Sequence, residues 1–537
     1  MEGIYLKRKS WAVLLVLLMA VSTALYGCGG DEGSEGGDSA SNTLIFGRGG
    51  DSVGLDPITV TDGESFKVTK NIFETLVEFG EQDTEIQAGL AKEWDVAEDG
   101  LTYTFTLQEG VKFQDGTDFN ADAVVFNFER WMNGTADEFP YYGSMFGGFK
   151  GDEGHVIQEV NAVDESTVEF KLKRPQAPFL KNLAMSMFSI ASPTAVEELG
   201  DKFAKQPTDA GTGPFKFVEW KENDRIVLEK NEDYWQEDLP KLDQIIFKSI
   251  PENSARLNAL MSGEIDLADG INPSDAEKIT SDENLQLYER PSLNVGYLGL
   301  TNTREPFNNP KVRQALNHAV NKQAIIDAFF EGKADPAKNP MPPVINGYNE
   351  DIEGYEFDLD KAKELLAEAG YPDGFEMELW AMPVPRPYMP DGQKVAEAIQ
   401  ADFAKIGVEA EIVSFEWATY LDKASKGEAD AFLLGWTGDN GDADNFLYTL
   451  LDKDNIGSNN YAYYSNDELH DLLIEAQTEV DEDKRAELYK QAQEIIHEDA
   501  PWIPLAHSTP LLAGSAKVKN FLPHPTGSDL LSGVSIE

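Results

Sequence analysis

The stretch GWTGDNGDADNFL, which begins at Gly435, contains three aspartates within six consecutive positions. Asp439, Asp442 and Asp444 closely follow Trp436, and the turn-forming pair Asn-Gly separates the first two aspartates. Such a group of carboxylates could bind a metal ion, perform acid–base chemistry, pair with a cationic ligand or form a solvated turn. The spacing by itself leaves all four alternatives open.

The metal alternative does not fit the spacing of these carboxylates. An EF-hand loop requires D-x-[DN]-x-[DN]-G with glutamate at position twelve, whereas counting from Asp442 places Leu447 sixth and Lys453 twelfth. The six histidines of the chain form no HxxxH or HExxH pair, so the sequence carries no zinc motif. We therefore expect neither a metal nor a cofactor.

Acid–base catalysis has little support in the motifs of the chain. A glycosidase would need two carboxylates about 5–9 Å apart, which folding could bring together from any part of the sequence. The G-x-S-x-G pattern occurs at GDSVG, from Gly50, but within a glycine-rich stretch that we do not expect to be a nucleophile elbow. The stretch GRGGDSVG, from Gly47, lacks the Lys-Ser/Thr of a phosphate-binding loop and is expected to be a turn. We expect no enzymatic activity, and an extracellular hydrolase such as a glycosidase is the remote alternative.

The composition is that of a large, acidic, globular protein. Its 537 residues exceed one ordinary hydrophobic core, so two or three domains are expected, and 41% hydrophobic residues suffice to fill them. The net charge is −52, from 96 acidic against 44 basic residues. Because nucleic-acid phosphates attract basic surfaces, this charge argues strongly against nucleic acid as a partner. A solvated acidic surface suits a protein that works outside the cell.

The N-terminus has the pattern of a lipoprotein signal sequence. The basic segment KRK, from Lys7, precedes an apolar run from Trp11 to Val21 that is short for a membrane span of about 20 residues. The next segment, LYGC, ends at Cys28 and resembles a lipobox, in which cleavage exposes a cysteine that is then lipidated. We expect residues 1–27 to be removed and the protein to be anchored by lipid on the outer face of the cytoplasmic membrane.

Residues 28–42 form a predicted tether. The segment GGDEGSEGGDSASN, which follows Cys28, has no apolar residue larger than alanine and cannot bury enough surface to fold. Cys28 is also the only cysteine, so no intrachain disulfide can form. Loss of residues 1–27 removes three positive charges and one negative charge, which leaves the mature chain at −54.

From Thr43 onward, strand patterns and helix patterns alternate. Period-two or β-branched runs predict strands at 102–108, 168–173, 215–220 and 225–230. The stretch DLDKAKELLAEAG predicts a helix that Asp358 caps and that ends at Gly370. The stretch GQKVAEAIQADFAKIG, from Gly392, predicts another helix, and a strand is expected from Val408. Helices followed by strands indicate α/β layers.

Five collinear segments resemble extracytoplasmic solute-binding proteins of peptide ABC importers. They are LAKEWDVAEDGLTYTFTLQEGVKF from Leu90, GTGPFKFVEW from Gly211, NPKVRQALNHAVNK from Asn309, KAKELLAEAGYPDGF from Lys361 and ELYKQAQEIIHEDAPWIPL from Glu487. The resemblance extends from about Thr43 to Glu537. Two further segments, WAMPVPRPYMP from Trp380 and GWTGDNGDADNF from Gly435, are similar to the dipeptide-binding branch. Ala443 stands where that branch typically has proline.

The resemblance implies an α/β, two-lobed periplasmic-binding-protein-like fold of the class with an extra domain, which makes three domains. The implied boundaries are 43–75, 206–292 and 508–537 for domain I, 76–205 for domain II, and 293–507 for domain III. The chain is expected to cross between domains near Arg290–Asn294 and Leu505–Pro510, where extended segments lie. The lobes would close on a ligand about these crossovers.

The resemblance also implies roles for four residues. The position of Asp439 binds the ligand's α-ammonium, and the position of Arg386 binds its α-carboxylate. Trp436 and Tyr388 are expected to be apolar walls of the pocket. A free dipeptide carries its two charges roughly 6–7 Å apart. A carboxylate at one end and a guanidinium fork at the other compensate both charges when the site closes and water leaves.

The implied protein is a monomer that captures dipeptides, with tripeptides as an extension, and delivers them to the membrane permease of an ABC importer. Binders of longer oligopeptides, haem or a nickel chelate in the same family are the alternatives. The Asp439 and Arg386 pair distinguishes them, because a ligand that lacks one terminus leaves one charge unpaired. Asp442 and Asp444 keep a structural interpretation, as a turn group and a helix-cap group.

Overall fold

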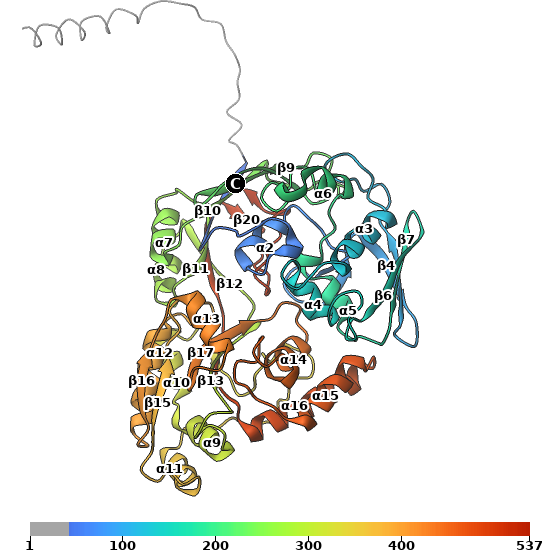
Figure 1. Ribbon diagram of the computed structural model, residues 1–537. Helices are drawn as coiled ribbons and strands as arrows, with labels where there is room; N and C mark the ends of the chain where they lie inside the picture. The colour runs from blue at the N-terminus through green and yellow to red at the C-terminus, as the bar shows by residue number, and fades with distance from the viewer. Residues whose placement is uncertain (1–41) are drawn as a thin grey trace, which may run out of the picture. The chain divides into compact units, whose positions relative to one another are not determined.

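The computed structural model describes residues 42–537 (Figure 1). The predicted signal peptide, the predicted lipidation site Cys28 and the predicted tether up to Ser41 lie outside the described residues. Asn42, which the sequence places at the end of the tether, is instead attached to folded structure. Its carbonyl accepts a hydrogen bond from Asp243 N–H at 2.9 Å, because strand β1 already begins at the next residue. Among the described residues, no helix is both long and apolar enough to cross a bilayer.

A seven-stranded sheet is built from widely separated parts of the chain, in the order β12-β19-β11-β1-β10-β9-β8. Its strands are β1 (Thr43–Arg48), β8 (Phe215–Lys221), β9 (Arg225–Lys230), β10 (Gln244–Ser249), β11 (Leu267–Ile271), β12 (Leu285–Glu289) and β19 (Leu511–Ser515). Strand β1 runs parallel to β10 and β11, and the other pairs are antiparallel. Strands β8 and β9 confirm the predictions at 215–220 and 225–230.

A four-stranded antiparallel sheet, ordered β4-β5-β7-β6, lies between β1 and β8 in the sequence. Its strands are β4 (Ala91–Val96), β5 (Thr102–Leu107), β6 (Ile157–Asp164) and β7 (Thr167–Leu172), and β2 (Val77–Phe79) pairs with β3 (Ile86–Ala88) beside it. Alternate side chains of β5 are buried, as its period-two sequence predicts. The ring of Phe170 on β7 packs edge-on against Phe128 of helix α3 at 4.7 Å, so the helix covers this face of the sheet.

A six-stranded mixed sheet, ordered β14-β18-β13-β17-β15-β16, carries most of the candidate site. Its strands are β13 (Asn294–Leu300), β14 (Ala334–Pro336), β15 (Glu376–Trp380), β16 (Glu409–Val413), β17 (Ala431–Thr437) and β18 (Trp502–Ser508). Every residue of β13 and β18 is buried, since the two strands pair in the middle of the sheet. In Figure 1 this sheet lies at the lower left, and the four-stranded sheet at the right.

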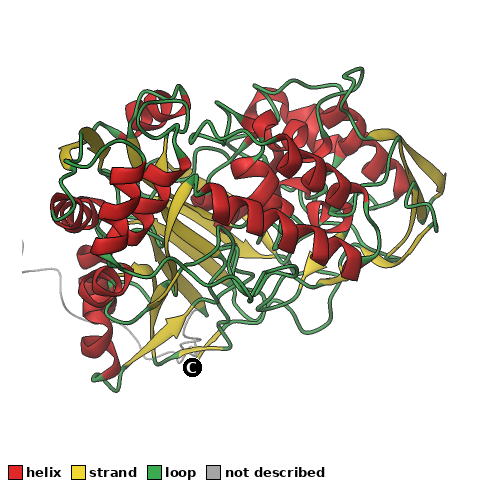
Figure 2. Ribbon diagram, turned by 90° about the horizontal axis from the view of Figure 1, so that it is seen from below, coloured by secondary structure: helices red, strands yellow, loops and turns green. Residues whose placement is uncertain are grey.

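Helices surround these sheets (Figure 2). Their bounds are α2 (Gly63–Thr69), α3 (Ala121–Met132), α4 (Pro140–Phe146), α5 (Phe179–Leu183), α6 (Pro193–Leu199), α7 (Asn253–Met261), α8 (Ala276–Thr280), α9 (Pro310–Ala319), α10 (Lys322–Phe329), α11 (Leu359–Glu368), α12 (Gly392–Ala404), α13 (Trp417–Ser425), α14 (Asp444–Leu451), α15 (Asp467–Thr478) and α16 (Glu482–Asp499). Helices α11 and α12 confirm the two helix predictions. Asp358 caps α11 by accepting hydrogen bonds from the N–H groups of Asp360 and Lys361.

The chain passes between the seven-stranded and six-stranded sheets at two places, after β12 and before β19. The two connections lie side by side, because Arg290 N–H donates to Pro510 O at 2.9 Å. The buried Arg290 guanidinium also donates to both carboxylate oxygens of Asp529, at 2.6 and 2.9 Å. Asn294 and Ser508, at the facing ends of β13 and β18, exchange hydrogen bonds of 2.9 and 3.0 Å. The domain boundaries themselves stay a prediction.

Candidate functional site

The loop between β17 and α14, residues 438–443, carries Asp439 and has a tightly constrained backbone. Asp442 Oδ1 accepts a hydrogen bond from Asp444 N–H at 2.9 Å, which folds the chain into an Asx turn before the helix. Gly441 has a positive φ of 63°, and a Cβ there would lie 1.9 Å from Thr84 Oγ1. Only glycine therefore allows the loop to approach the segment that carries Thr84.

Asp439 is partly buried, and its hydrogen bonds come from uncharged groups. Tyr141 Oη, on α4, donates to Oδ1 at 3.3 Å, and Asn445 Nδ2 donates to Oδ2 at 3.4 Å. Asn445 Oδ1 accepts from both Asp439 N–H and Trp436 Nε1, each at 3.0 Å. One asparagine side chain thus fixes Asp439 and Trp436 relative to each other.

The charge of Asp439 has no cationic partner, since none of the ion pairs formed within residues 42–537 involves it. Burial raises the pKa of Asp439 to about 6, although the hydrogen bonds from Asn445 and Tyr141 act in the opposite direction. Burial and the nearby carboxylate also raise the pKa of Tyr141 well above its usual value, so the phenol remains a donor. Asp439 is therefore a carboxylate that would gain from a cation.

The neighbouring aspartates serve the structure. Asp442 accepts two hydrogen bonds of 2.7 Å from the Arg485 guanidinium, on α16. Burial opposes ionisation of Asp442, but Arg485 prevails and holds its pKa down at about 2. The turn role predicted for Asp442 is confirmed, with a buried ion pair added.

The helix-cap role predicted for Asp444 is wrong. The N-cap position of α14 is Ala443, which makes no side-chain cap, and Asp444 is the first helical residue. The Asp444 carboxylate points away from the helix end because Gln477 Nε2, on α15, donates to its Oδ1 at 3.0 Å. Burial and the adjacent Asp442 raise the pKa of Asp444 to about 7.

The segment carrying Arg386 lies across the middle of the six-stranded sheet. Arg386 and Met389 exchange backbone hydrogen bonds of 3.0 and 2.9 Å and so form a tight turn. Beneath this turn, Gly296 of β13 and Gly435 of β17 are cross-strand partners. A Cβ at Gly435 would lie 2.2 Å from the Tyr388 ring, and a Cβ at Gly296 would lie 2.4 Å from the Tyr388 carbonyl oxygen. The paired glycines therefore make the space in which the turn rests.

The Arg386 side chain is exposed, whereas Tyr388 is buried. The guanidinium carbon of Arg386 lies 5.2 Å from the centre of the Trp417 ring. Burial raises the pKa of Tyr388 to about 12, and the nearby Arg386 charge limits this rise. Within the described part of the chain, no ion pair includes Arg386.

The structure places Trp436 and Asp439 on β17 and its following loop, and it packs a third predicted binding residue, Tyr388, against the same strand. Trp436 and Asp439 share Asn445, and the Tyr388 ring rests on Gly435. No hydrogen bond or ion pair of the described residues joins Arg386 to Asp439.

Sequence reasoning missed Asn445 and Tyr141. Asn445 follows the three aspartates and could have been proposed as a partner of Asp439, since an asparagine amide can donate and accept at once. Tyr141 carries no such signal, because it lies 298 positions from Asp439 in the sequence. Two adjacent residues of α5 reach the same loop, with Lys181 Nζ donating to Gly441 O at 2.9 Å and Asn440 Nδ2 donating to Asn182 Oδ1 at 2.8 Å.

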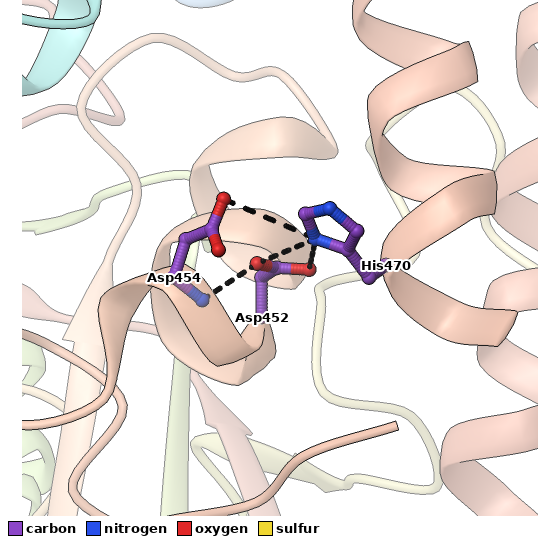
Figure 3. A group of neighbouring side chains, drawn as sticks. All are labelled: Asp452, Asp454 and His470. Carbon is purple, nitrogen blue, oxygen red and sulfur yellow. Dashed lines mark hydrogen bonds and ion pairs between the residues drawn. The ribbon is translucent and has the colours of Figure 1, made fainter. Parts of the chain in front are cut away.

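Asp452, Asp454 and His470 form the one group among the described residues with metal-ligand spacing (Figure 3). Their polar atoms are engaged with one another. His470 Nδ1 lies 3.1 and 3.0 Å from the two oxygens of Asp452, and Asp454 N–H donates to Asp452 Oδ1 at 2.8 Å. Asp452 thus closes a turn and orients a histidine, which accounts for the group without an ion.

Comparison with known proteins identifies the family. The family described as bacterial extracellular solute-binding proteins, family 5 Middle, matches residues 85–458. The chain is 40% identical to heme-binding protein A of Haemophilus influenzae, over 94% of both chains. It is 41% identical to the dipeptide-binding protein of Escherichia coli, over 93% of this chain and 95% of that one.

A solved structure extends this likeness to the fold. The dipeptide-binding protein of Pseudoalteromonas sp. SM9913 in complex with Met-Leu superposes with a TM-score of 0.82 at 30% identity, covering 92% of this chain and all of that chain. The predicted α/β fold, with two lobes and an extra domain, is confirmed. The chain belongs to the bacterial extracellular solute-binding proteins of family 5.

Proposed function

We propose that this protein captures dipeptides, and tripeptides as an extension, and delivers them to the permease of an ABC importer. The observation that carries this proposal is Asp439, a partly buried carboxylate with a pKa raised to about 6 and only neutral hydrogen-bond donors around it. A peptide α-ammonium supplies the missing cation. The names of the Escherichia coli and Pseudoalteromonas relatives support this choice of ligand.

Arg386 supplies the complementary charge for the peptide α-carboxylate. Arg386 is exposed and makes no ion pair within the described residues, and its one side-chain partner there is the neutral Tyr388 hydroxyl, so its charge remains available. Trp436 and Tyr388 line the space between the two charged groups. Since both charges of a dipeptide belong to its backbone termini, side chains of the peptide contribute little to recognition, and we expect broad sequence tolerance.

Haem is the second candidate ligand, because one relative of 40% identity is named a heme-binding protein. Two carboxylates but no ammonium are available on haem, so it would leave Asp439 without a cation. The free charge of Asp439 therefore favours a zwitterionic peptide over haem. Binding without chemistry is also what we propose for the activity, since members of this family are solute-binding proteins.

Closure of the protein on its ligand is part of the proposal. Residues Tyr141, Lys181 and Asn182 bond to three consecutive residues, 439–441, of the loop that would hold the peptide amine. A peptide that engages this loop stabilises the arrangement in which these contacts form. Ligand therefore shifts the protein from an open to a closed form through its higher affinity for the closed one.

We expect the radius of gyration to fall when Met-Leu is added, measured by small-angle X-ray scattering. The Asp439→Asn variant at the same peptide concentration is the control and should keep the larger radius, because it binds too weakly to be saturated. An unchanged radius of the parent protein at proven saturation would rule out closure by ligand.

The assignment of the peptide termini can be tested with modified ligands. N-acetylation of Met-Leu removes the ammonium and leaves Asp439 unpaired in the closed site, which costs about 3–5 kcal/mol, or roughly two to four decades in Kd. In Asp439→Asn the same acetylation should cost less than about tenfold, because the interaction is already absent. Isothermal titration calorimetry gives both values.

The reciprocal control combines C-terminal amidation of the peptide with substitution of Arg386. C-terminal amidation should be costly for the parent and for Asp439→Asn, and nearly without effect for Arg386→Gln. Arg386→Lys should recover only part of the affinity, because an ammonium cannot form two parallel bonds to a carboxylate. If acetylation weakens Asp439→Asn as strongly as the parent, Asp439 does not bind the amine.

Affinity should also depend on pH through Asp439. A bound ammonium lowers the pKa of Asp439 below its free value of about 6, so binding releases the Asp439 proton. The affinity should be highest near pH 7 and fall as the pH drops through 6, by up to roughly tenfold per unit. Above about pH 8 it should fall again, because the peptide amine itself loses its proton. Between about pH 5 and 7 both peptide termini stay charged, so the change reports on the protein.

Titration of Met-Leu at pH 5, 6 and 7 provides the measurement. Asp439→Asn is the matched control and should give a flat profile, since an amide does not titrate in this range. A pH dependence that persists unchanged in Asp439→Asn would assign it to another group.

We further propose that lipid on Cys28 anchors the mature protein to the outer face of the cytoplasmic membrane, and that it acts there as a monomer. The sole cysteine after an apolar signal segment supports the anchor. The Cys28→Ser variant should appear in the soluble fraction of the periplasm or medium, as followed by immunoblotting of separated fractions. Fractionation of Cys28→Ser with membranes, as for the parent protein, would exclude this anchor.

A further inference from the structure

Arg386 needs more support for its side chain than its own turn provides. An arginine side chain has four rotatable bonds, and ordering it on a ligand costs rotamer entropy. Arg386 is exposed and, within residues 42–537, no carboxylate forms an ion pair with it. The turn fixes the backbone of Arg386, and the Tyr388 hydroxyl of the same turn accepts from one edge of the guanidinium, which does not by itself fix the guanidinium plane.

The Trp417 ring supplies a surface for this guanidinium. The guanidinium carbon lies 5.2 Å from the ring centre, which is within cation–π range. A planar guanidinium that stacks on an aromatic face keeps its N–H donors at the edge of the stack, where a carboxylate can accept two of them. The stack therefore fixes the orientation of the donors without using any of them.

Trp417 is itself held in place by the interior of the protein. It is the first residue of α13, is partly buried and stacks on Tyr420 with ring centres 5.8 Å apart and an interplanar angle of 21°. The fully buried Tyr420 hydroxyl donates to Leu433 O, on β17, at 2.7 Å and lies 3.2 Å from Trp380 O, on β15. Through Tyr420, the Trp417 ring is thus held against two strands of the six-stranded sheet.

Tyr388 is the second aromatic residue beside Arg386. Its ring rests on Gly435, and the Arg386 charge acts on its hydroxyl. Tyr388 and Trp417 reach Arg386 from different elements, namely the turn of Arg386 itself and helix α13. Strand β17 fixes both, since it carries Gly435 and also the carbonyl that accepts from Tyr420. The strand that leads to Asp439 therefore also sets the positions of the two aromatic rings beside Arg386.

We propose that Trp417 is a positioning residue that orients the Arg386 guanidinium for a two-point contact with the ligand carboxylate. This inference rests on the proposed role of Arg386. It makes Trp417 a determinant of specificity for ligands that end in a free carboxylate, without any contact between Trp417 and the peptide.

The test compares Met-Leu with its C-terminal amide in calorimetric titrations. Trp417→Leu removes the ring and should weaken binding of the free acid by about three- to thirtyfold, with binding of the amide changed by less than about twofold. Trp417→Phe retains a π face and should recover most of the affinity for the acid. In an Arg386→Gln background, Trp417→Leu should add no further loss.

Two controls separate this role from a structural one. Trp436→Leu alters a proposed pocket wall and should weaken the acid and the amide to the same degree. Trp417→Met, whose flexible side chain adapts to irregular space, serves if Trp417→Leu does not fold, as judged by thermal melting. An equal loss for acid and amide in Trp417→Leu or Trp417→Met, or no loss for the acid, would overturn the inference.

The outcome also distinguishes this inference from the proposed function. If Arg386→Gln binds acid and amide with the same ratio as the parent, the role of Arg386 is wrong and the inference falls with it. If Arg386→Gln loses selectivity for the acid while Trp417→Leu retains it, only the role of Trp417 is wrong.

Discussion

Residues 438–444 contain three aspartates, and each carboxylate has a different kind of hydrogen-bond partner. Arg485 neutralises Asp442 through two hydrogen bonds of 2.7 Å, and a neutral amide, Gln477, serves Asp444. Asp439 receives hydrogen bonds only from a phenol and an amide, so within the described residues its charge is hydrogen-bonded but not neutralised. The paired charge holds the loop, and the unpaired charge is left for a ligand. The rest of the site serves to keep this one carboxylate in place and partly dry.

The six-stranded sheet provides that support because it has glycines where the turn that carries Tyr388 packs against it. Gly296 and Gly435 face each other on adjacent strands, and the turn that carries Tyr388 occupies the space that two Cβ atoms would fill. Because Gly435 also belongs to the strand that ends just before Asp439, one strand sets the positions of both proposed ligand contacts, Asp439 and Arg386. A rigid separation between an anionic and a cationic group is what measures the length of a zwitterionic ligand.

The connections between the sheets lie beside this site. Arg290 and Asp529 form a buried ion pair where the first connection leaves the seven-stranded sheet. Asn294 and Ser508 are hydrogen-bonded to each other where the two connections meet the six-stranded sheet. Ser508 Oγ also donates to Pro387 O at 2.8 Å, in the turn of Arg386. A change of angle at the crossovers would therefore act directly on the turn that carries Arg386, the proposed cationic contact. This arrangement connects ligand binding with the relative position of the sheets.

Local features of the fold were predictable because they depend on neighbouring residues. The periodicity of 102–108 and 225–230 predicted β5 and β9, and Asp358 caps α11 as its position before an apolar stripe indicates. The charged motif around Asp439 was also recognisable, because its residues are contiguous. The cap role assigned to Asp444 was wrong, since sequence spacing does not reveal that Gln477 on another helix competes for its carboxylate.

The sequence by itself determined the element types, the order of the motifs, the acidic surface and the identity of the two proposed charged contacts. Only the tertiary structure decided which groups surround them. Tyr141 reaches Asp439 across 298 positions, Trp417 approaches Arg386 from a separate helix, and Gly296 meets Gly435 across two strands. Secondary structure follows from interactions a few residues apart, whereas the charge and dielectric environment of a carboxylate depends on every segment that folding packs around it.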